Sequence, residues 1–249
     1  MTRPHPRPLP EGEGATRYNP PVPISTLFID LDDTLYPHSS GLWPALRQRI
    51  DLYMVERLGI PADQVDELRR QYFEQYGTAL RGLEFHYPVD RADYLIYVHA
   101  VDLRAYIGPD PTLRAALLQF PARKFIFTNA DSAHARRVTD VLGVTDCFDG
   151  VIDTNALAPY CKPERAAFER ALDIAGESDP ARCALIDDLP RTVHAAREFG
   201  MVGILFGAAT QDGGSEAILD DWSSLGGIIR ELVARGGIQS HDSPGTADH

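Results

Sequence analysis

Three short apolar runs of this sequence each end in side chains that could carry out phosphate and metal chemistry. The first run, Thr26 to Asp30, leads into Asp-Leu-Asp-Asp-Thr at 30–34, the second ends in Thr128-Asn129 and the third in Asp187-Asp188. Such runs are typical of strands buried on both faces. Because ligands of open parallel sheets bind outside the carboxyl ends of the strands, we expect the three groups to meet at one edge.

The residue types indicate what this edge could do. Neighbouring carboxylates repel each other unless a cation lies among them, and all-oxygen ligation suits Mg²⁺. Asp30 beside a cation is a candidate nucleophile, and Asp32 is a candidate general acid and base. Thr128 and Asn129 could hold an oxyanion, and Lys162, at a loop-to-helix junction, could complete the charge balance for phosphate.

The elements that must position these residues alternate along the chain. Further apolar runs predict strands at 124–128, 151–153, 184–187 and 202–206. Helical spacing or helix-end signals predict helices over 132–142, 163–175 and 190–199. This alternation predicts βαβ units, and therefore an α/β fold with a Rossmann-like parallel sheet covered on both faces.

Residues 38–110 differ from the rest of the chain in the pattern of their apolar residues. They lack comparable strands and repeat apolar residues at helical spacing, with a third helical segment over about 91–105. We expect an inserted all-helical cap at 38–110 and a catalytic core formed by 24–37 and 111–235. Residues 1–23, which hold seven of the 19 prolines, and residues 236–249 are expected to be disordered tails.

The charge of the chain excludes several classes of protein. The 249 residues carry 36 acidic and 24 basic side chains, a formal net charge of −12, which argues against a nucleic-acid polymer or a membrane surface as partner. Neither a membrane-spanning run nor the apolar stretch of a signal peptide is found. Three cysteines without metal spacing fit a reducing cytoplasm. The sequence does not indicate the oligomeric state.

Four motifs, in order, resemble those of the haloacid dehalogenase (HAD) superfamily. The first is Asp-x-Asp-x-Thr after a buried strand, here Asp30, Asp32 and Thr34. The others are a threonine ending the next strand (Thr128), a lysine before a helix (Lys162, followed by Pro163) and an acidic pair after a strand (Asp187-Asp188). A match to all four in the required order is specific.

The resemblance implies roles for these residues and a small phosphomonoester substrate. Asp30 would attack phosphorus and form an aspartyl-phosphate, while Asp32 would protonate the leaving oxygen and later activate water. The implied Mg²⁺ ligands are Asp30, the backbone carbonyl of Asp32, Asp188 and Asp187. The implied phosphate-binding residues are Thr128, Asn129 and Lys162. Aspartate at position 32 is typical of the phosphatases and not of the dehalogenases of this superfamily.

A narrower resemblance concerns the pyrimidine 5′-nucleotidase family. It rests on DLDDTLYPHSSGLWPALRQRI, YGTALRGL, VDRADYLIYVH and RKFIFTNADSAHARRV, which cover the cap as well as the core. It implies dephosphorylation of nucleotides such as UMP or CMP. The chain departs from that family at its fourth motif, where Leu189 and Thr192 replace the usual serine and asparagine.

Cap residues are candidates for selecting the substrate. Tyr94, His86 or His99 could stack on a base, and Arg81 could pair with a phosphate or a carbonyl. The histidines at 134 and 194, on predicted core helices, are not expected to be ligands.

Three alternatives remain open at the level of sequence. The first is a phosphatase for another small metabolite, such as a sugar phosphate. The second is a phosphoaspartate signalling module, although receiver domains carry the phosphorylated aspartate on a later strand and have no helical insert of this size. The third is a degenerate binding protein that keeps only the fold.

Overall fold

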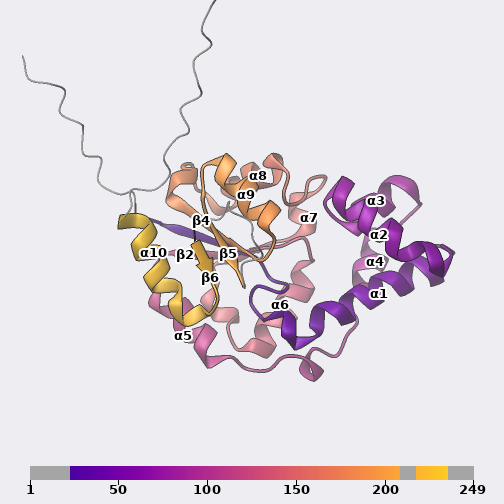
Figure 1. Ribbon diagram of the computed structural model, residues 1–249, viewed down its shortest axis with the longest axis horizontal. Helices are drawn as coiled ribbons and strands as arrows, with labels where there is room; N and C mark the ends of the chain where they lie inside the picture. Colours follow the sequence, from indigo (N-terminus) through magenta and orange to yellow (C-terminus); the bar gives the residue numbers. More distant parts are fainter. Residues whose placement is uncertain (1–22, 208–216, 235–249) are drawn as a thin grey trace, which may run out of the picture.

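The computed structural model describes residues 23–207 and 217–234, and a six-stranded parallel sheet lies at its centre (Figure 1). The strand order is β3-β2-β1-β4-β5-β6, and every neighbouring pair is parallel. The order places β1 between β2 and β4, so the strands that lead into three of the four motifs are neighbours. The strands are β1 Thr26–Ile29, β2 Arg123–Phe127, β3 Gly150–Ile152, β4 Cys183–Asp187, β5 Val202–Phe206 and β6 Ala217–Leu219.

Helices cover both faces of the sheet, because successive side chains of a strand point to opposite faces. Leu27 and Ile29 of β1 belong to the apolar cluster that includes residues of α5 (Pro111–Gln119), α6 (Ser132–Leu142) and α10 (Leu225–Ala234). Phe28 belongs to the opposite cluster, with residues of α7 (Thr154–Leu157), α8 (Arg165–Ala175) and α9 (Pro190–Phe199). This is the α/β architecture that the alternating sequence pattern predicts.

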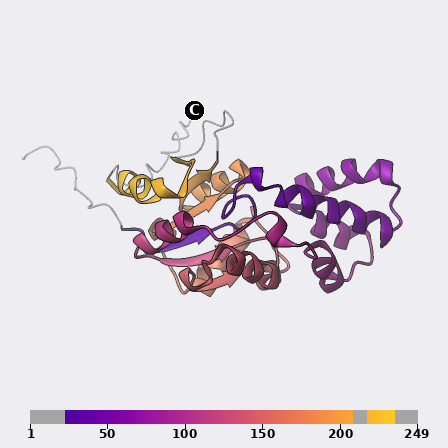
Figure 2. The ribbon, with the colours of Figure 1, turned by 90° about the horizontal axis from the view of Figure 1, so that it is seen from below.

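Four helices between β1 and α5 form the inserted cap. They are α1 (Leu42–Glu56), α2 (Ala62–Tyr76), α3 (Ala79–His86) and α4 (Arg91–Val98). Figures 1 and 2 show them grouped beyond one edge of the sheet layer. The cap has a separate apolar cluster, which includes Tyr53, Met54, Leu83 and Tyr94.

The structure corrects some of the expected boundaries. The helix expected over 91–105 ends at Val98, and after an irregular stretch Asp102 accepts the backbone N–H of Arg104 and begins a separate 3-10 turn. Helix α8 begins at Arg165 rather than at 163, and the short strand β6 is an addition. The 3-10 turns are His38–Ser40, Leu103–Ala105, Thr145–Cys147, Pro180–Arg182 and Trp222–Ser224.

The expected tails at 1–23 and 236–249 lie outside the described residues, apart from position 23. In the two described stretches, 23–207 and 217–234, no helix is long and apolar enough to cross a membrane.

Candidate active site

Asp30 follows β1 directly and is held at the carboxyl edge of the sheet. Its backbone N–H donates to the carbonyl of Ile186 in β4 at 2.9 Å, which fixes the residue between two strands. Its carboxylate is buried, with 7% of the residue exposed. Oδ1 accepts from Lys162 Nζ at 2.6 Å, and Oδ2 accepts from the hydroxyl of Thr34 at 3.2 Å. Both oxygens of the candidate nucleophile are therefore oriented by donors.

Lys162 reaches this carboxylate from the loop before α8. The side-chain amide of Asn129 donates to the Lys162 carbonyl at 3.1 Å, and its oxygen accepts the Lys162 backbone N–H at 2.9 Å. These two bonds fix the loop, and Nζ lies 2.7 Å from Asp187 Oδ2 as well as beside Asp30. Burial acts to lower the pKa of Lys162, but the charges of Asp187 and Asp30 outweigh it and raise the pKa, so the ammonium form is favoured.

Three carboxylates form a cluster that fits a hard divalent cation. Asp30, Asp187 and Asp188 each offer an oxygen, and these oxygens lie within 4.8 Å of one another. Burial, together with the charges of neighbouring carboxylates, raises the pKa of Asp30 to about 7 and that of Asp188 to about 9. An oxygen-only ligand set of this charge is of the type that Mg²⁺ prefers. The crowding of like charges is the physical reason why a cation fits here.

Asp32 has a different environment from Asp30. Its Oδ1 accepts from the phenol of Tyr36 at 2.5 Å and lies 3.2 Å from Nε2 of His134. Burial acts to raise the pKa of Asp32, but the charge and hydrogen bond of His134 and the hydrogen bond of Tyr36 lower it overall. Asp30 and Asp32 thus have their pKa values shifted in opposite directions, because Asp30 is buried and crowded by carboxylates whereas the buried Asp32 lies beside His134 and Tyr36.

The remaining motif residues also lie at the sheet edge. The Thr128 hydroxyl is buried and accepts the backbone N–H of Ala130 at 3.0 Å. The backbone N–H of Leu189 donates to Asp187 Oδ1 at 2.9 Å, a bond that depends on no particular side chain at 189. Thr192 is buried in α9. The fourth motif therefore holds its first carboxylate despite the unusual residues at 189 and 192.

A cavity of about 300 Å³ lies between this edge and the cap. The core side of its lining includes Asp30, Asp32, Thr128, Lys162 and Asp188. The cap contributes mainly apolar and aromatic groups, together with two arginines and a histidine: Trp43, Leu46, Arg47, Ile50, Arg69, Phe73, Leu80, Tyr94, Leu95, Val98 and His99.

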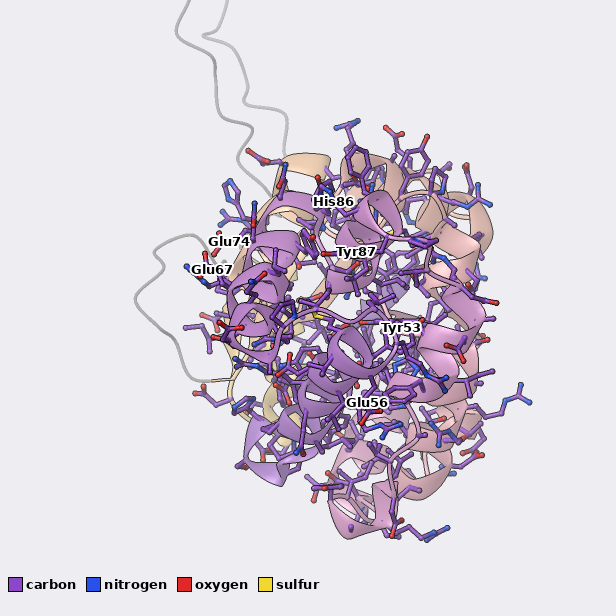
Figure 3. The ribbon with its side chains drawn as sticks, turned by 90° about the vertical axis from the view of Figure 1, so that its right-hand side faces the viewer. Tyr53, Glu56, Glu67, Glu74, His86 and Tyr87 are labelled. Atoms are coloured by element: carbon purple, nitrogen blue, oxygen red, sulfur yellow. The ribbon has the colours of Figure 1, made fainter. Side chains whose placement is uncertain are left out.

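The structure separates the four expected cap residues into two groups. Tyr94 and His99 line the cavity. Arg81 does not, because its guanidinium pairs with Glu164 at 2.8 Å and contacts Cys161 Sγ. His86 also lies away from the cavity, bonded to Tyr76 on the outer side of the cap that faces the viewer in Figure 3. The expectation that Arg81 and His86 line a substrate pocket therefore does not hold for this cavity.

Four side chains of the site are not among the residues predicted from the sequence. His134, which is not expected to be a ligand, contacts Asp32, and Tyr36 donates to the same carboxylate. Arg47 and Arg69 line the cavity while pairing with Asp66. The contact of Tyr36 could have been predicted from the sequence, since Tyr36 lies only four residues after Asp32. No signal in the sequence places His134 beside Asp32.

A family model for haloacid dehalogenase-like hydrolases matches residues 24–200, which include all four motifs and the cap. The chain belongs to this hydrolase family. The matched residues include strands β1 to β4 and end just before β5, so the family assignment does not depend on a single motif.

Among curated proteins, this HAD hydrolase is similar to Phosphate metabolism protein 8 of Saccharomyces cerevisiae (strain ATCC 204508 / S288c). The two are 31% identical over 190 residues, which cover 70% of this chain and 59% of the yeast protein. The chain thus spans less than two thirds of that relative.

Solved structures of HAD proteins share the fold. CbbY from Rhodobacter sphaeroides in complex with phosphate is 18% identical, with a TM-score of 0.60 over 82% of this chain and 96% of CbbY. The magnesium-bound HAD-hydrolase YfnB from Bacillus subtilis is 17% identical, with a TM-score of 0.54 over 83% and 99%. The 2-haloacid dehalogenase of Pseudomonas syringae pv. Tomato DC3000 is 22% identical, with a TM-score of 0.52 over 84% and 99%. At these identities the likeness concerns the fold alone.

Proposed function

We propose that this HAD hydrolase is a Mg²⁺-dependent phosphatase that hydrolyses nucleoside 5′-monophosphates, with pyrimidine nucleotides preferred, through an aspartyl-phosphate on Asp30. One observation carries the proposal: Lys162 joins the Asp30 carboxylate to the acidic pair at 187–188, and Asp32 lies beside them in the lining of the same cavity. A nucleophile, an acid and base, and a cationic group are thereby gathered at one site.

The proposed first step transfers the phosphoryl group to the enzyme. A carboxylate oxygen of Asp30 attacks phosphorus as the bond from phosphorus to the leaving oxygen breaks, and Asp32 gives its proton to that oxygen. The lysine ammonium has three N–H donors. Two of them are directed at Asp30 and Asp187, which leaves the third for a phosphoryl oxygen.

The proposed second step releases phosphate. Asp32 takes a proton from water as the water oxygen attacks phosphorus, and the bond between phosphorus and Asp30 breaks. Thr128 and the backbone N–H of Asn129 are the proposed further contacts to phosphoryl oxygens. The side-chain amide of Asn129 already bonds to the Lys162 backbone, so its proposed role is to position the lysine.

The proposed metal ligands are the carboxylates of Asp30, Asp187 and Asp188 and the backbone carbonyl of Asp32. When bound, Mg²⁺ would neutralise charge on the phosphoryl oxygens and on the crowded carboxylates. The oxygens of the three carboxylates lie close enough together to share one cation, which supports this assignment.

The cap side of the cavity supports a leaving group with an aromatic ring. Trp43, Phe73 and Tyr94 supply aromatic surface there. A nucleobase can stack on such surface, whereas a sugar phosphate offers mainly hydroxyl groups that need polar partners. The yeast relative's name, Phosphate metabolism protein 8, agrees with a role in phosphate chemistry but identifies no substrate.

A panel of rates tests the proposal. Phosphate release is measured from UMP, CMP, AMP and two sugar phosphates, each with Mg²⁺ and with a chelator. We expect Mg²⁺-dependent hydrolysis with kcat/KM highest for UMP or CMP. A preference for a sugar phosphate would overturn the nucleotide assignment, and a stable phosphoaspartate without turnover would favour a signalling module.

A further inference from the structure

Two side chains contact the same oxygen of the Asp32 carboxylate. The phenol of Tyr36 lies 2.5 Å from Oδ1, and Nε2 of His134 lies 3.2 Å from that atom. Among the described residues, these are the only hydrogen bonds of the Asp32 side chain. The side chain keeps 17% of its surface exposed and lines the cavity.

The ring of His134 is held in place from two directions. Its backbone N–H donates to Oδ1 of Asp131 at 2.7 Å, at the start of α6. Its ring stacks on that of His99, with centroids 4.2 Å apart and planes 11° apart. His99 is in turn bonded through Nδ1 to Oδ2 of Asp131 at 2.7 Å. One aspartate therefore fixes both the His134 backbone and the ring packed against His134.

The surroundings of His134 also indicate which ring nitrogen carries hydrogen. The side chain is fully buried, and Nδ1 has no hydrogen-bond partner within the described stretches. A hydrogen on Nδ1 would leave a buried donor unsatisfied and would direct the Nε2 lone pair at a carboxylate. A hydrogen on Nε2 avoids both penalties, so Nε2 donates to Asp32.

We infer that His134 is a positioning residue for the general acid and base Asp32. With Tyr36 it occupies Oδ1, so the proton that Asp32 gives to the leaving group and takes back from water is carried on Oδ2. This role rests on the proposed phosphatase function and adds to it a residue from α6, outside the four motifs. Acid catalysis matters most when the leaving group is a poor one, and that gives the role a kinetic signature.

The kinetic test compares two leaving groups in variants at position 134. UMP has a poor alkoxide leaving group, whereas 4-nitrophenyl phosphate has a good one. His134→Ala should lower kcat/KM at least tenfold for UMP and several-fold less for 4-nitrophenyl phosphate. His134→Gln, which can place an amide donor where Nε2 lies, should recover much of the UMP activity. Tyr36→Phe, which removes the other donor to Oδ1 but keeps its ring, should show the same difference between substrates.

A matched control separates positioning from stability. His194 is exposed on α9, and His194→Ala should leave both rates unchanged. If His134→Ala lowers kcat/KM equally for the two substrates, or leaves both rates unchanged, the inference is overturned. The proposed function would still be supported by turnover of the wild-type protein. If His134→Ala fails to fold, His134→Gln and Tyr36→Phe decide by the same comparison. Loss of all wild-type turnover would instead reject the proposed function.

A second measurement does not depend on activity. Long-range ¹H–¹⁵N spectra of the uniformly labelled protein, assigned by comparison with His134→Gln, report which ring nitrogen is protonated. We expect the His134 signal to show hydrogen on Nε2. A neutral ring with its hydrogen on Nδ1 cannot donate to Asp32 and would overturn the inference whatever the substrate.

Discussion

At the scale of single residues, the site depends on a balance between buried charges of opposite sign. Lys162 is 4% exposed and bridges Asp30 and Asp187, each of which is buried. Taking such charges out of water is costly, and their mutual attraction offsets the cost only while every partner is present. The same contacts that are proposed to bind phosphate therefore contribute to the stability of the fold.

Replacing this lysine should affect stability and activity together. Lys162→Met leaves two buried carboxylates without their cation, so the free energy of unfolding should fall by about 3–5 kcal/mol in urea titrations with chelator present. Turnover should fall at least ~100-fold. The matched control is Lys124→Met, because Lys124 is the only other lysine of the sequence and lies near the start of β2, bonded to two backbone carbonyls. This control should lose stability but retain activity. The opposite pattern would contradict the role of Lys162.

Spacing and residue type place the motif residues on the sheet edge but do not reveal every contact. The proximity of Asp30, Asp187 and Asp188 could be predicted, because these residues come at the ends of apolar strands of one parallel sheet. The contact of His134 with Asp32 could not be predicted, because it depends on how α6 packs against the loop after β1. Arg81 and His86 show a related limit: helical spacing indicates neighbours on a face, but only the packing of the cap decides which face lines the cavity.

At the scale of elements, Arg191 links the catalytic core to the cap. It lies in the first turn of α9, and its guanidinium donates to the carbonyls of Phe73 and Gly77 at 2.9 Å each. The guanidinium also stacks on the Phe73 ring, 3.6 Å from its centroid. Phe73 and Gly77 both line the cavity. The helix that follows the acidic pair thus holds a wall of the cavity.

Removing this link should act mainly on substrate binding. Arg191→Ala should raise KM for the preferred nucleotide about 3- to 10-fold with a smaller change in kcat, because the wall moves while the catalytic groups stay in place. Arg191→Lys should not restore the wild-type KM, since an ammonium offers neither the paired donors nor the planar stack. The exposed pair of Arg70 with Glu67 supplies the control, and Arg70→Ala should leave KM unchanged. An unchanged KM in Arg191→Ala would show that the link does not shape the cavity.

The alternation of strands and helices predicted the parallel sheet, and the strand-free helical spacing of residues 38–110 predicted the inserted cap. The same reasoning extended the last cap helix beyond Val98, because apolar spacing continues past the point where the backbone turns. His99 follows that turn, with its ring bonded to Asp131 at 2.7 Å. A contact between residues 32 positions apart is a tertiary interaction that local spacing cannot encode.

At the scale of the whole molecule, the acidic character of the chain extends into the cavity where the chemistry is proposed. The chain has a net charge of −12, and four of the cavity-lining residues are the aspartates at 30, 32, 33 and 188. A negative protein does not attract a negative phosphate at long range. In the proposed mechanism, Lys162, the cavity-lining Arg47 and Arg69, and a bound Mg²⁺ would reverse the potential within the cavity.

This charge distribution predicts how stability depends on pH and metal. The folded-state pKa of Asp30 is about 7 and that of Asp188 about 9, each raised from 3.8 chiefly by burial. Because the folded protein binds these protons more tightly than the unfolded chain, the metal-free protein should lose stability as pH rises from about 4 to 9. Added Mg²⁺ should raise Tm most at the alkaline end of that range.

The measurement is a series of thermal melts with chelator and with Mg²⁺ across this range. Asp188→Asn removes one of the two raised carboxyl groups, so it should flatten the pH slope of the metal-free protein and reduce the increase in Tm on adding Mg²⁺. A metal-free Tm that rises towards alkaline pH would contradict the arrangement of charges described above.

The most direct test of the central claim is the rate of phosphate release by Asp30→Asn beside the wild-type protein, with UMP and Mg²⁺. Asparagine keeps the size of the side chain but removes its nucleophilic carboxylate, so we predict a folded protein, with a Tm close to wild type or higher, and no detectable turnover. Turnover of the folded Asp30→Asn protein at the wild-type rate would contradict an aspartyl-phosphate mechanism at this site.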